Sequence, residues 1–392
     1  MKRTPKKGNR IAALAADAAL LVAVLLAVLA FAEAAFRFAD VYPPLDKGEK
    51  GKGGFREGLR IVRIDPDVPI PFGMRPGART DEKTPGSSDT FSVRTNNFGM
   101  RGPDIEFKKP AGAVRVLTMG DSWTFGEGVN DGETFTAQLG GLLSGVGRHV
   151  EMLNAGYTAG YSPDSYYVYL MRKGFSFKPD VVVVASMVVN DLFDLGSNGW
   201  PETDARGLPR SVESYTMRVN DKGQYGYFED RRKQNPVMQP SRIALLNKLR
   251  VNTFWRDLLF RVYYQPYVMK NEKAGADAES GADSMKRYQL VIAGMNEECR
   301  RRGVEFVLAL IPAFEYDRGK LDVNSTGVAE TVNFCRRNGI RVVNLEEVML
   351  AEMTTPNGYD WPRYHITGNG HWNARGHRVA AEAIAREIRK AK

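Results

Sequence analysis

The 392-residue sequence contains only two cysteines, Cys299 and Cys335, and only four histidines. Two cysteines are too few for a disulfide framework or a cysteine zinc site, and we expect two separately buried thiols. His365, His371 and His377 follow one another at intervals of six residues, which puts no pair of them on one face of a helix. We therefore expect no metal, and no other cofactor is indicated.

The net charge is +9, and five of the basic residues behind this excess lie within the first ten positions. Elsewhere along the chain, positive and negative residues alternate, as on an ordinary solvated surface. This distribution excludes a nucleic-acid partner. Five basic residues lie within the first ten positions: Lys2, Arg3, Lys6, Lys7 and Arg10.

One long apolar run, residues 11–32, follows this basic segment and is broken only by Asp17. About 20 apolar residues suffice to span a bilayer as a helix. Because the positive charges precede the run, we predict a cytoplasmic tail at 1–10, a single-pass anchor at 11–32, and the remainder on the periplasmic or extracellular side of the cytoplasmic membrane. The alternative is a cleaved signal peptide, since "AEA" at 32–34 has a small-x-small pattern.

Residues 33–105 contain a Gly- and Lys-rich stretch followed by short apolar patches cut by prolines and glycines. They predict a tether and an extension of short strands and turns. From 106 to 392 the pattern changes to buried apolar runs alternating with helical stretches, which predicts a three-layer α/β/α domain around a parallel sheet. The runs are 114–122, 149–156, 179–191, 304–312 and 340–345, and the helical stretches include 132–144, 163–174 and 285–302.

The connection 192–284 is a long insertion in this domain. It contains an amphipathic segment, 241–264, which could contact a membrane or cover the site. We expect this segment to be a helix packed on the core, because apolar helix faces are normally buried.

Polar residues follow three of the predicted strands, at the edge where parallel sheets bind ligands. Ser122 in "GDSWTFG" occupies the place that suits a nucleophile, with its own N–H available to an oxyanion. Such pairs are common in turns, so Ser122 alone is a weak signal. The other polar positions strengthen it: Asp121 beside the serine, Asn154 and Gly156 after the second run, and Asn190 and Asp191 after the third.

Elimination narrows the candidates for a general base from four histidines to two. His149 precedes the second strand, at the far end from the site, and His377 lies a turn into the last helix, which Asn373 is expected to cap. His365 and His371 remain as competitors. His371, in the loop "TGNGHWNARGH", is the better candidate because a helix follows it directly.

Four blocks in order resemble the SGNH (GDSL-type) hydrolases, over residues 114–392. "GDSWTFGEGV" implies that Ser122 is the nucleophile, and "LNAGYTAGYS" implies that Gly156 donates its backbone N–H to the oxyanion. "VVNDLF" implies an amide donor at Asn190, and "GHWNARGH" implies that His371 is the base. The resemblance also implies a flavodoxin-like sheet. The stretch "NNFGMRGPD", 96–104, is similar to the segment that precedes the domain in membrane-anchored members.

The chain departs from this family where an aspartate usually stands two or three residues before the histidine. Gly368 and Asn369 occupy those positions. Asn369 could orient the imidazole without a charge, and the family includes enzymes that use only a Ser–His dyad. Losing the carboxylate can cost as much as ~10⁴ in turnover, so low activity is also consistent with the sequence.

The resemblance and the anchor together predict a membrane-tethered esterase or O-acyltransferase that acts on acyl esters, expected to be acetyl, of an envelope polysaccharide. A lipid or lysophospholipid esterase is an alternative enzyme. The third reading is a non-catalytic glycan-binding or assembly protein on a degenerate hydrolase scaffold. The membrane and the acyl-ester substrate are the only partners that the sequence indicates.

Overall fold

The structure, a computed structural model, describes residues 61–84, 89–145, 149–157, 161–214, 217–219, 225–227, 276–317, 320–367 and 370–390. All of them except Ala276 belong to one compact unit, formed by Gly53–Phe228 and Asp277–Lys392. The expected anchor 11–32, the amphipathic segment 241–264 and Asn369 lie outside the described residues. Within the ranges given, no helix combines the length and the apolar character needed to cross a bilayer.

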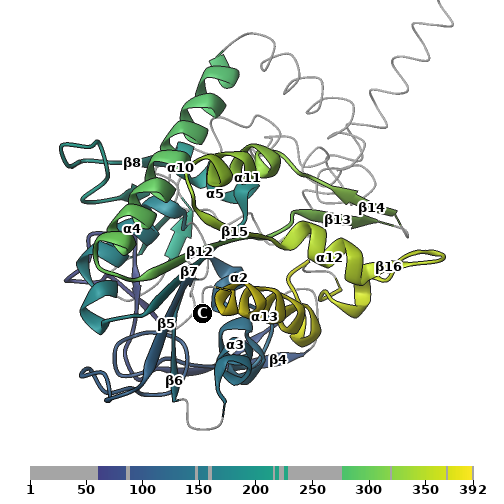
Figure 1. Cartoon of the computed structure of the whole chain (residues 1–392), viewed down its shortest axis with the longest axis horizontal. Coiled ribbons are helices and arrows are strands. Elements are labelled where there is room, and N and C mark those ends of the chain that lie inside the picture. Colours follow the sequence, from purple (N-terminus) through teal and green to yellow (C-terminus); the bar gives the residue numbers. More distant parts are fainter. Residues whose placement is uncertain are drawn as a thin grey trace, which may run out of the picture. The chain divides into compact units, whose positions relative to one another are not determined.

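A five-stranded parallel sheet forms the centre of this unit, in the order β6-β5-β7-β12-β15 (Figure 1). This is the flavodoxin-like order that was expected. Gly120 pairs with both Gly156 and Ala185, so these three strands end at one edge. The strands are β5 Val114–Gly120, β6 Val150–Gly156, β7 Val181–Ser186, β12 Glu305–Leu310 and β15 Arg341–Asn344.

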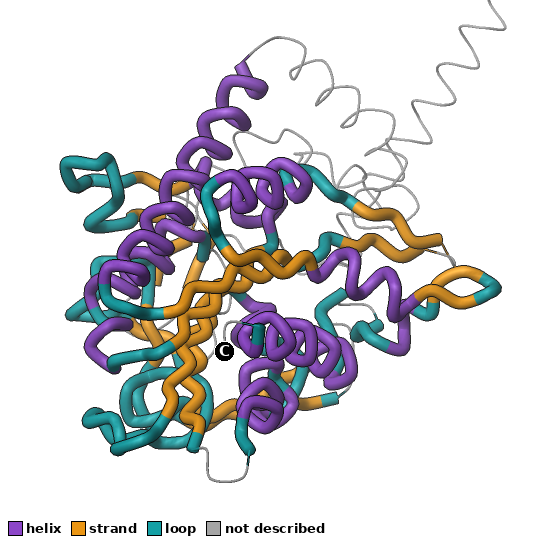
Figure 2. The backbone as a smooth tube through the Cα atoms, viewed as in Figure 1, coloured by secondary structure: helices purple, strands orange, loops and turns teal. Residues whose placement is uncertain are grey.

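Helices cover both faces of the sheet, as Figure 2 shows. Successive strand residues point to opposite faces, so Val116 packs in one buried cluster and Leu117 in the other. The Leu117 face is covered by α4 Pro163–Arg172, α5 Val188–Ser197, α10 Ala276–Arg301 and α11 Val328–Arg337. The Val116 face is covered by α3 Phe135–Leu143, α12 Leu345–Met353 and α13 Ala374–Arg389. The prediction of three layers is confirmed.

Side-chain caps begin helices α3 and α13. Thr134 accepts the Ala137 N–H at the start of α3, and Asn373 accepts the N–H groups of Arg375 and Gly376 at the start of α13. The cap expected at Asn373 is confirmed. Such a cap is worth about 1 kcal/mol and sets where the helix begins.

Residues 61–84 and 89–100 share the core of the sheet. Ile61, Phe72 and Met100 are buried in the same cluster as Leu117. Two antiparallel strand pairs make up this segment: β1 Val62–Arg63 with β2 Gly73–Met74, and β3 Arg79–Lys83 with β4 Thr90–Arg94. The short strands expected here are present, and they share the core of the sheet.

All five strands are shorter than the predicted runs, and in two of them the shortening places site residues in helices. The apolar run 179–191 is a strand only to Ser186, and α5 begins at Val188, so Asn190 and Asp191 lie in the first turn of a helix. The first strand ends at Gly120, and Ser122 opens the short helix α2, Ser122–Phe125. Apolar periodicity alone cannot separate a buried strand from the buried start of a helix.

Helix α10 begins at Ala276, before the predicted start at 285, and so includes the end of the insertion 192–284. The remaining elements are short. Cys299 and Cys335 are buried free thiols, as expected. The short strand pairs are β8 Asn198–Gly199 with β9 Glu213–Ser214, β10 Met217–Val219 with β11 Tyr225–Tyr227, β13 Phe314–Asp317 with β14 Lys320–Val323, and β16 Thr354–Thr355 with β17 Gly358–Tyr359. The 3₁₀ turns are η1 Asp131–Glu133, η2 Gly174–Phe177 and η4 Trp361–Arg363.

Candidate active site

The turn from β5 into α2 places Ser122 at the carboxyl edge of the sheet. Asp121 is the N-cap residue, and its side chain accepts the N–H of Trp123. A Cβ on Gly120 would lie 2.1 Å from Thr124 Oγ1 and 2.6 Å from the carbonyl oxygen of Ala185, so only glycine fits there. The tight turn therefore leaves Ser122 half-buried at the start of the helix.

Ser122 Oγ lies 2.8 Å from Nε2 of His371, although 249 residues separate the two in the chain. This is the geometry of a nucleophile and its base within hydrogen-bond reach. For Nε2 to accept the hydroxyl proton, Nδ1 must carry the ring hydrogen. The expected pairing of these two residues is present.

Aromatic packing orients the His371 ring. Its ring lies 4.7 Å from that of Trp123 at an angle of 32°, and Trp372 packs edge-on against Trp123 at 5.0 Å. The Ile366 N–H donates to the carbonyl of His371 and closes the loop on itself. Since Trp372 is completely buried, this loop is anchored directly beside the base.

His365 and His377 have other partners. The His365 ring stacks on Trp361 at 4.6 Å, and His377 Nδ1 accepts the N–H of Phe135. Burial lowers the pKa of His365 to about 4 and that of His377 to about 3. Both are fixed as neutral packing groups, so the competition between His365 and His371 is decided by tertiary contacts.

Asp121 joins the serine turn to the third strand end. Its carboxylate accepts the Trp123 N–H through Oδ1 and the Asn190 amide through Oδ2, both at 3.1 Å. Burial raises the pKa of Asp121 to about 7. One amide hydrogen of Asn190 is thereby used to fix its orientation, and Nδ2 carries a second one for another acceptor.

Gly156 does not fit the expected role of oxyanion donor. Its N–H donates to Asn154 Oδ1 at 2.9 Å, which occupies the group that this role requires. A Cβ on Gly156 would lie 2.3 Å from the backbone nitrogen of Phe125. Glycine is needed here because the end of β6 approaches the backbone of α2, a reason that the sequence alone does not reveal.

Asn154 and Arg101 both hydrogen-bond to backbone carbonyls of α2 or of its cap, and Arg101 was not among the predicted polar positions. Asn154 Nδ2 donates to the Thr124 carbonyl at 2.9 Å, and the Arg101 N–H donates to the Asn154 carbonyl. The signal for Arg101 was its place in "NNFGMRGPD", the stretch that resembles the lead-in to anchored family members.

The Arg101 guanidinium makes five hydrogen bonds and is almost completely buried. Nε pairs with Asp131 at 2.8 Å. The other four bonds go to backbone carbonyls of Ser92, Phe125, Gly126 and Val129. Burial lowers the pKa of Arg101 from its usual value, and the bond to Asp131 opposes that effect. Arg101 thus ties the turn after Ser122 to strand β4.

Glu127 is a second residue that the sequence analysis missed. Its N–H donates to the Ser122 carbonyl at 3.0 Å, so the residue borders the nucleophile. Burial raises the pKa of its carboxyl to about 7. Across the described ranges, no group of three or more His, Cys, Asp or Glu is arranged to hold a metal ion.

Comparisons with known proteins give distant structural similarity alone. No protein-family model and no curated protein sequence matches the chain. Similar solved structures include a lipolytic protein of the G-D-S-L family from Desulfitobacterium hafniense DCB-2, with 14% identity, 70% of this chain and 99% of that chain covered, and a TM-score of 0.36. A GDSL-like lipase from Bacteroides thetaiotaomicron VPI-5482 has 15% identity, 72% and 93% coverage, and a TM-score of 0.35.

An acetyl-xylooligosaccharide esterase from Geobacillus is similar to the same extent, with 14% identity, 72% and 96% coverage, and a TM-score of 0.37. At these identities and scores, similarity does not assign an activity. The function is therefore argued from the site.

Replacing Arg101 with Met should destabilise the protein by about 3 kcal/mol, because four buried carbonyls and Asp131 lose their donor. Urea unfolding followed by circular dichroism measures this change. Arg79→Met is the matched control on the neighbouring strand and should change stability by less than ~0.5 kcal/mol. Equal effects of the two substitutions would contradict the central role of Arg101.

His371 should remain neutral well below pH 6.5, since burial lowers its pKa to about 4. With ¹³Cε1-labelled histidine, the His371 signal should move by no more than about a tenth of its full titration range between pH 7.5 and pH 5. His371→Gln identifies that signal among four. An inflection near pH 6.5 in the signal that this substitution removes would show that the base is not held neutral by burial.

Proposed function

We propose that this protein is an exported, membrane-tethered serine esterase or O-acyltransferase of the SGNH type, acting on acyl esters of an envelope polysaccharide. The observation that carries the proposal is the contact of Ser122 Oγ with His371 Nε2 at 2.8 Å, at the carboxyl edge of the sheet. An arrangement of nucleophile and base in this position suits acyl transfer.

The reaction begins when Ser122 Oγ attacks the ester carbonyl and His371 Nε2 takes the hydroxyl proton. The tetrahedral intermediate collapses as the imidazolium returns the proton to the leaving alcohol, and an acyl-serine remains. Water then releases the acyl group as an acid, or a sugar hydroxyl accepts it as a new ester. His371 acts as the base for either acceptor.

Two donors support the developing oxyanion in this proposal. Ser122 is the first residue of α2, so its N–H has no partner within the helix. The Asn190 amide, held by Asp121, supplies the second donor. Each donor of this kind can be worth ~3 kcal/mol in the transition state. Gly156 is left out, because Asn154 occupies its N–H.

We further propose that Asn369 orients His371, since no carboxylate occupies positions 368–370 of the sequence. A neutral orienter stabilises the imidazolium less than an aspartate does. The low pKa of His371 works in the same direction, because burial disfavours the charged ring. Both effects predict a slow enzyme.

The tether and the polysaccharide substrate rest on the sequence. The apolar run 11–32 after a basic segment favours an anchor that confines the enzyme to esters at the outer face of the cytoplasmic membrane. Polysaccharide acylation is the process that similar anchored members of the family accompany. A lipid ester is the alternative substrate, and the relative rates on short and long acyl esters distinguish the two.

Ser122→Ala and His371→Ala should each lower p-nitrophenyl acetate turnover at least ~10³-fold and leave the unfolding curve unchanged, because both residues are half-buried at the site. Asn369→Asp should raise turnover by supplying the missing carboxylate. His365→Ala should retain most activity once folding is verified, because His365 does not contact Ser122.

Labelling with a fluorophosphonate provides the control for the binding-protein alternative. The native chain should be labelled and Ser122→Ala should not. If the native protein is neither labelled nor active, and an acetylated polysaccharide binds equally well to both, the chain is a glycan-binding protein.

The topology has its own test. Protease added to spheroplasts should degrade residues 40–392, and the full-length chain should retain its N-terminus, because 11–32 is expected to stay in the membrane. A mature N-terminus at Ala35 would replace the anchor with a cleaved signal peptide. An intact body after protease treatment would overturn export itself.

A further inference from the structure

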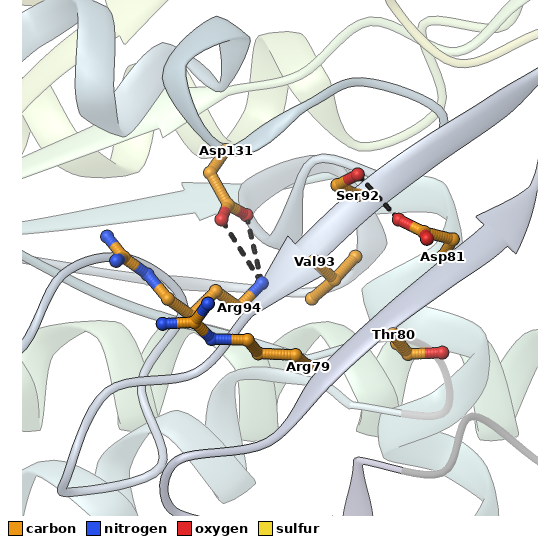
Figure 3. A pocket seen from close by; sticks show the side chains of 7 residues that line it. All are labelled: Arg79, Thr80, Asp81, Ser92, Val93, Arg94 and Asp131. Carbon is orange, nitrogen blue, oxygen red and sulfur yellow. Dashed lines mark hydrogen bonds between the residues drawn. The ribbon is translucent and has the colours of Figure 1, made fainter.

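A cavity of 430 Å³ lies on the β3–β4 hairpin beside η1, and neither Ser122 nor His371 lines it (Figure 3). Arg79 and Arg94 are direct partners across the two strands, and both line the cavity. Like charges in directly opposite positions destabilise a strand pair. The hairpin therefore carries a charge arrangement that costs stability and that its own fold does not require.

Neither arginine side chain has an acceptor among the described residues, and Arg94 Nε is buried without a hydrogen bond. The two carboxylates of the cavity are engaged elsewhere. Asp131 pairs with Arg101 and accepts the Arg94 backbone N–H, and Asp81 accepts the Ser92 hydroxyl at 2.6 Å. Because Arg101 neutralises Asp131, the cavity is left with two positive charges, on Arg79 and Arg94, and one negative charge, on Asp81.

We propose that Arg79 and Arg94 bind an anionic saccharide unit, with the two guanidinium groups holding a carboxylate or another oxyanion on the sugar. Guanidinium forks match such anions with two hydrogen bonds each. Ser92, Thr80 and the carboxylate oxygens in the same cavity suit sugar hydroxyls. Asp81, in the same cavity, would repel a uniformly anionic membrane surface, so a single charged group on a carbohydrate fits better.

The hairpin also reaches the rim of the active site. Thr84 lies five residues beyond Arg79, about 17 Å along an extended strand. A Cβ built on Gly128 would lie 3.4 Å from the Thr84 side chain and 2.3 Å from that of Ile366, which belongs to the His371 loop. A polymer whose acyl group is at Ser122 can therefore extend along this hairpin. This placement rests on the proposed function, whereas anion binding in the cavity does not.

Calorimetry on the full-length chain in detergent tests the binding, in a Ser122→Ala background that removes turnover. Tetragalacturonate is the charged probe, and its methyl ester is the matched neutral one. Arg79→Glu and Arg94→Gln should each weaken tetragalacturonate binding at least tenfold. Arg386→Glu, an equal charge reversal at an exposed position of α13, should not. The methyl ester should bind weakly to every variant.

The active enzyme gives a second readout. With an acetylated polyuronate, Arg79→Glu should raise KM and leave kcat unchanged, and p-nitrophenyl acetate turnover should not change. If the native protein binds tetragalacturonate but hydrolyses no ester, the proposed function is rejected and the saccharide site is retained. Three results would each overturn the saccharide site. The first is equal binding of both probes, and the second is binding of inorganic sulfate as tight as that of tetragalacturonate. The third is arginine-dependent binding to anionic vesicles without binding to tetragalacturonate.

Discussion

The buried guanidinium of Arg101 is the constraint on which the rest of the site depends. A charge in this position is tolerable only when every donor has an acceptor. Arg101 meets that requirement with Asp131 and with four carbonyls, including those of Phe125 and Gly126 just after the nucleophile. The turn that ends α2 is therefore built around this side chain, and the position of Ser122 follows from it.

The same residue connects the N-terminal segment to the elements that hold Ser122. Its guanidinium reaches Ser92 of strand β4, and its backbone N–H reaches the Asn154 carbonyl at the end of the second strand. Asn154 in turn holds Thr124 and Gly156 through its side chain. The hairpin, the nucleophile helix and the sheet edge are thus connected by hydrogen bonds, which favours a preorganised site.

Burial sets the electrostatic character of the site. It keeps the His371 ring neutral, and it raises the pKa values of Asp121 and Glu127 to about 7. Both carboxyl groups lie close to Ser122 in the chain, and Asp121 orients the Asn190 amide. The ring of His371 packs against that of Trp123.

The sequence by itself indicated the five strands, the three layers and the helix cap at Asn373, because periodicity and capping chemistry are local, and its four motif blocks pointed to Ser122. Tertiary structure alone decided that His371 faces Ser122. It also occupied the Gly156 N–H and gave Arg101 its role. Ser122 and His371 are 249 residues apart, and the partners of the Arg101 side chain are 9 to 30 residues away, so neither set of contacts leaves a periodic signal. Asn190 shows the limit between the two: an apolar run predicted a strand there, and packing made it the first turn of a helix.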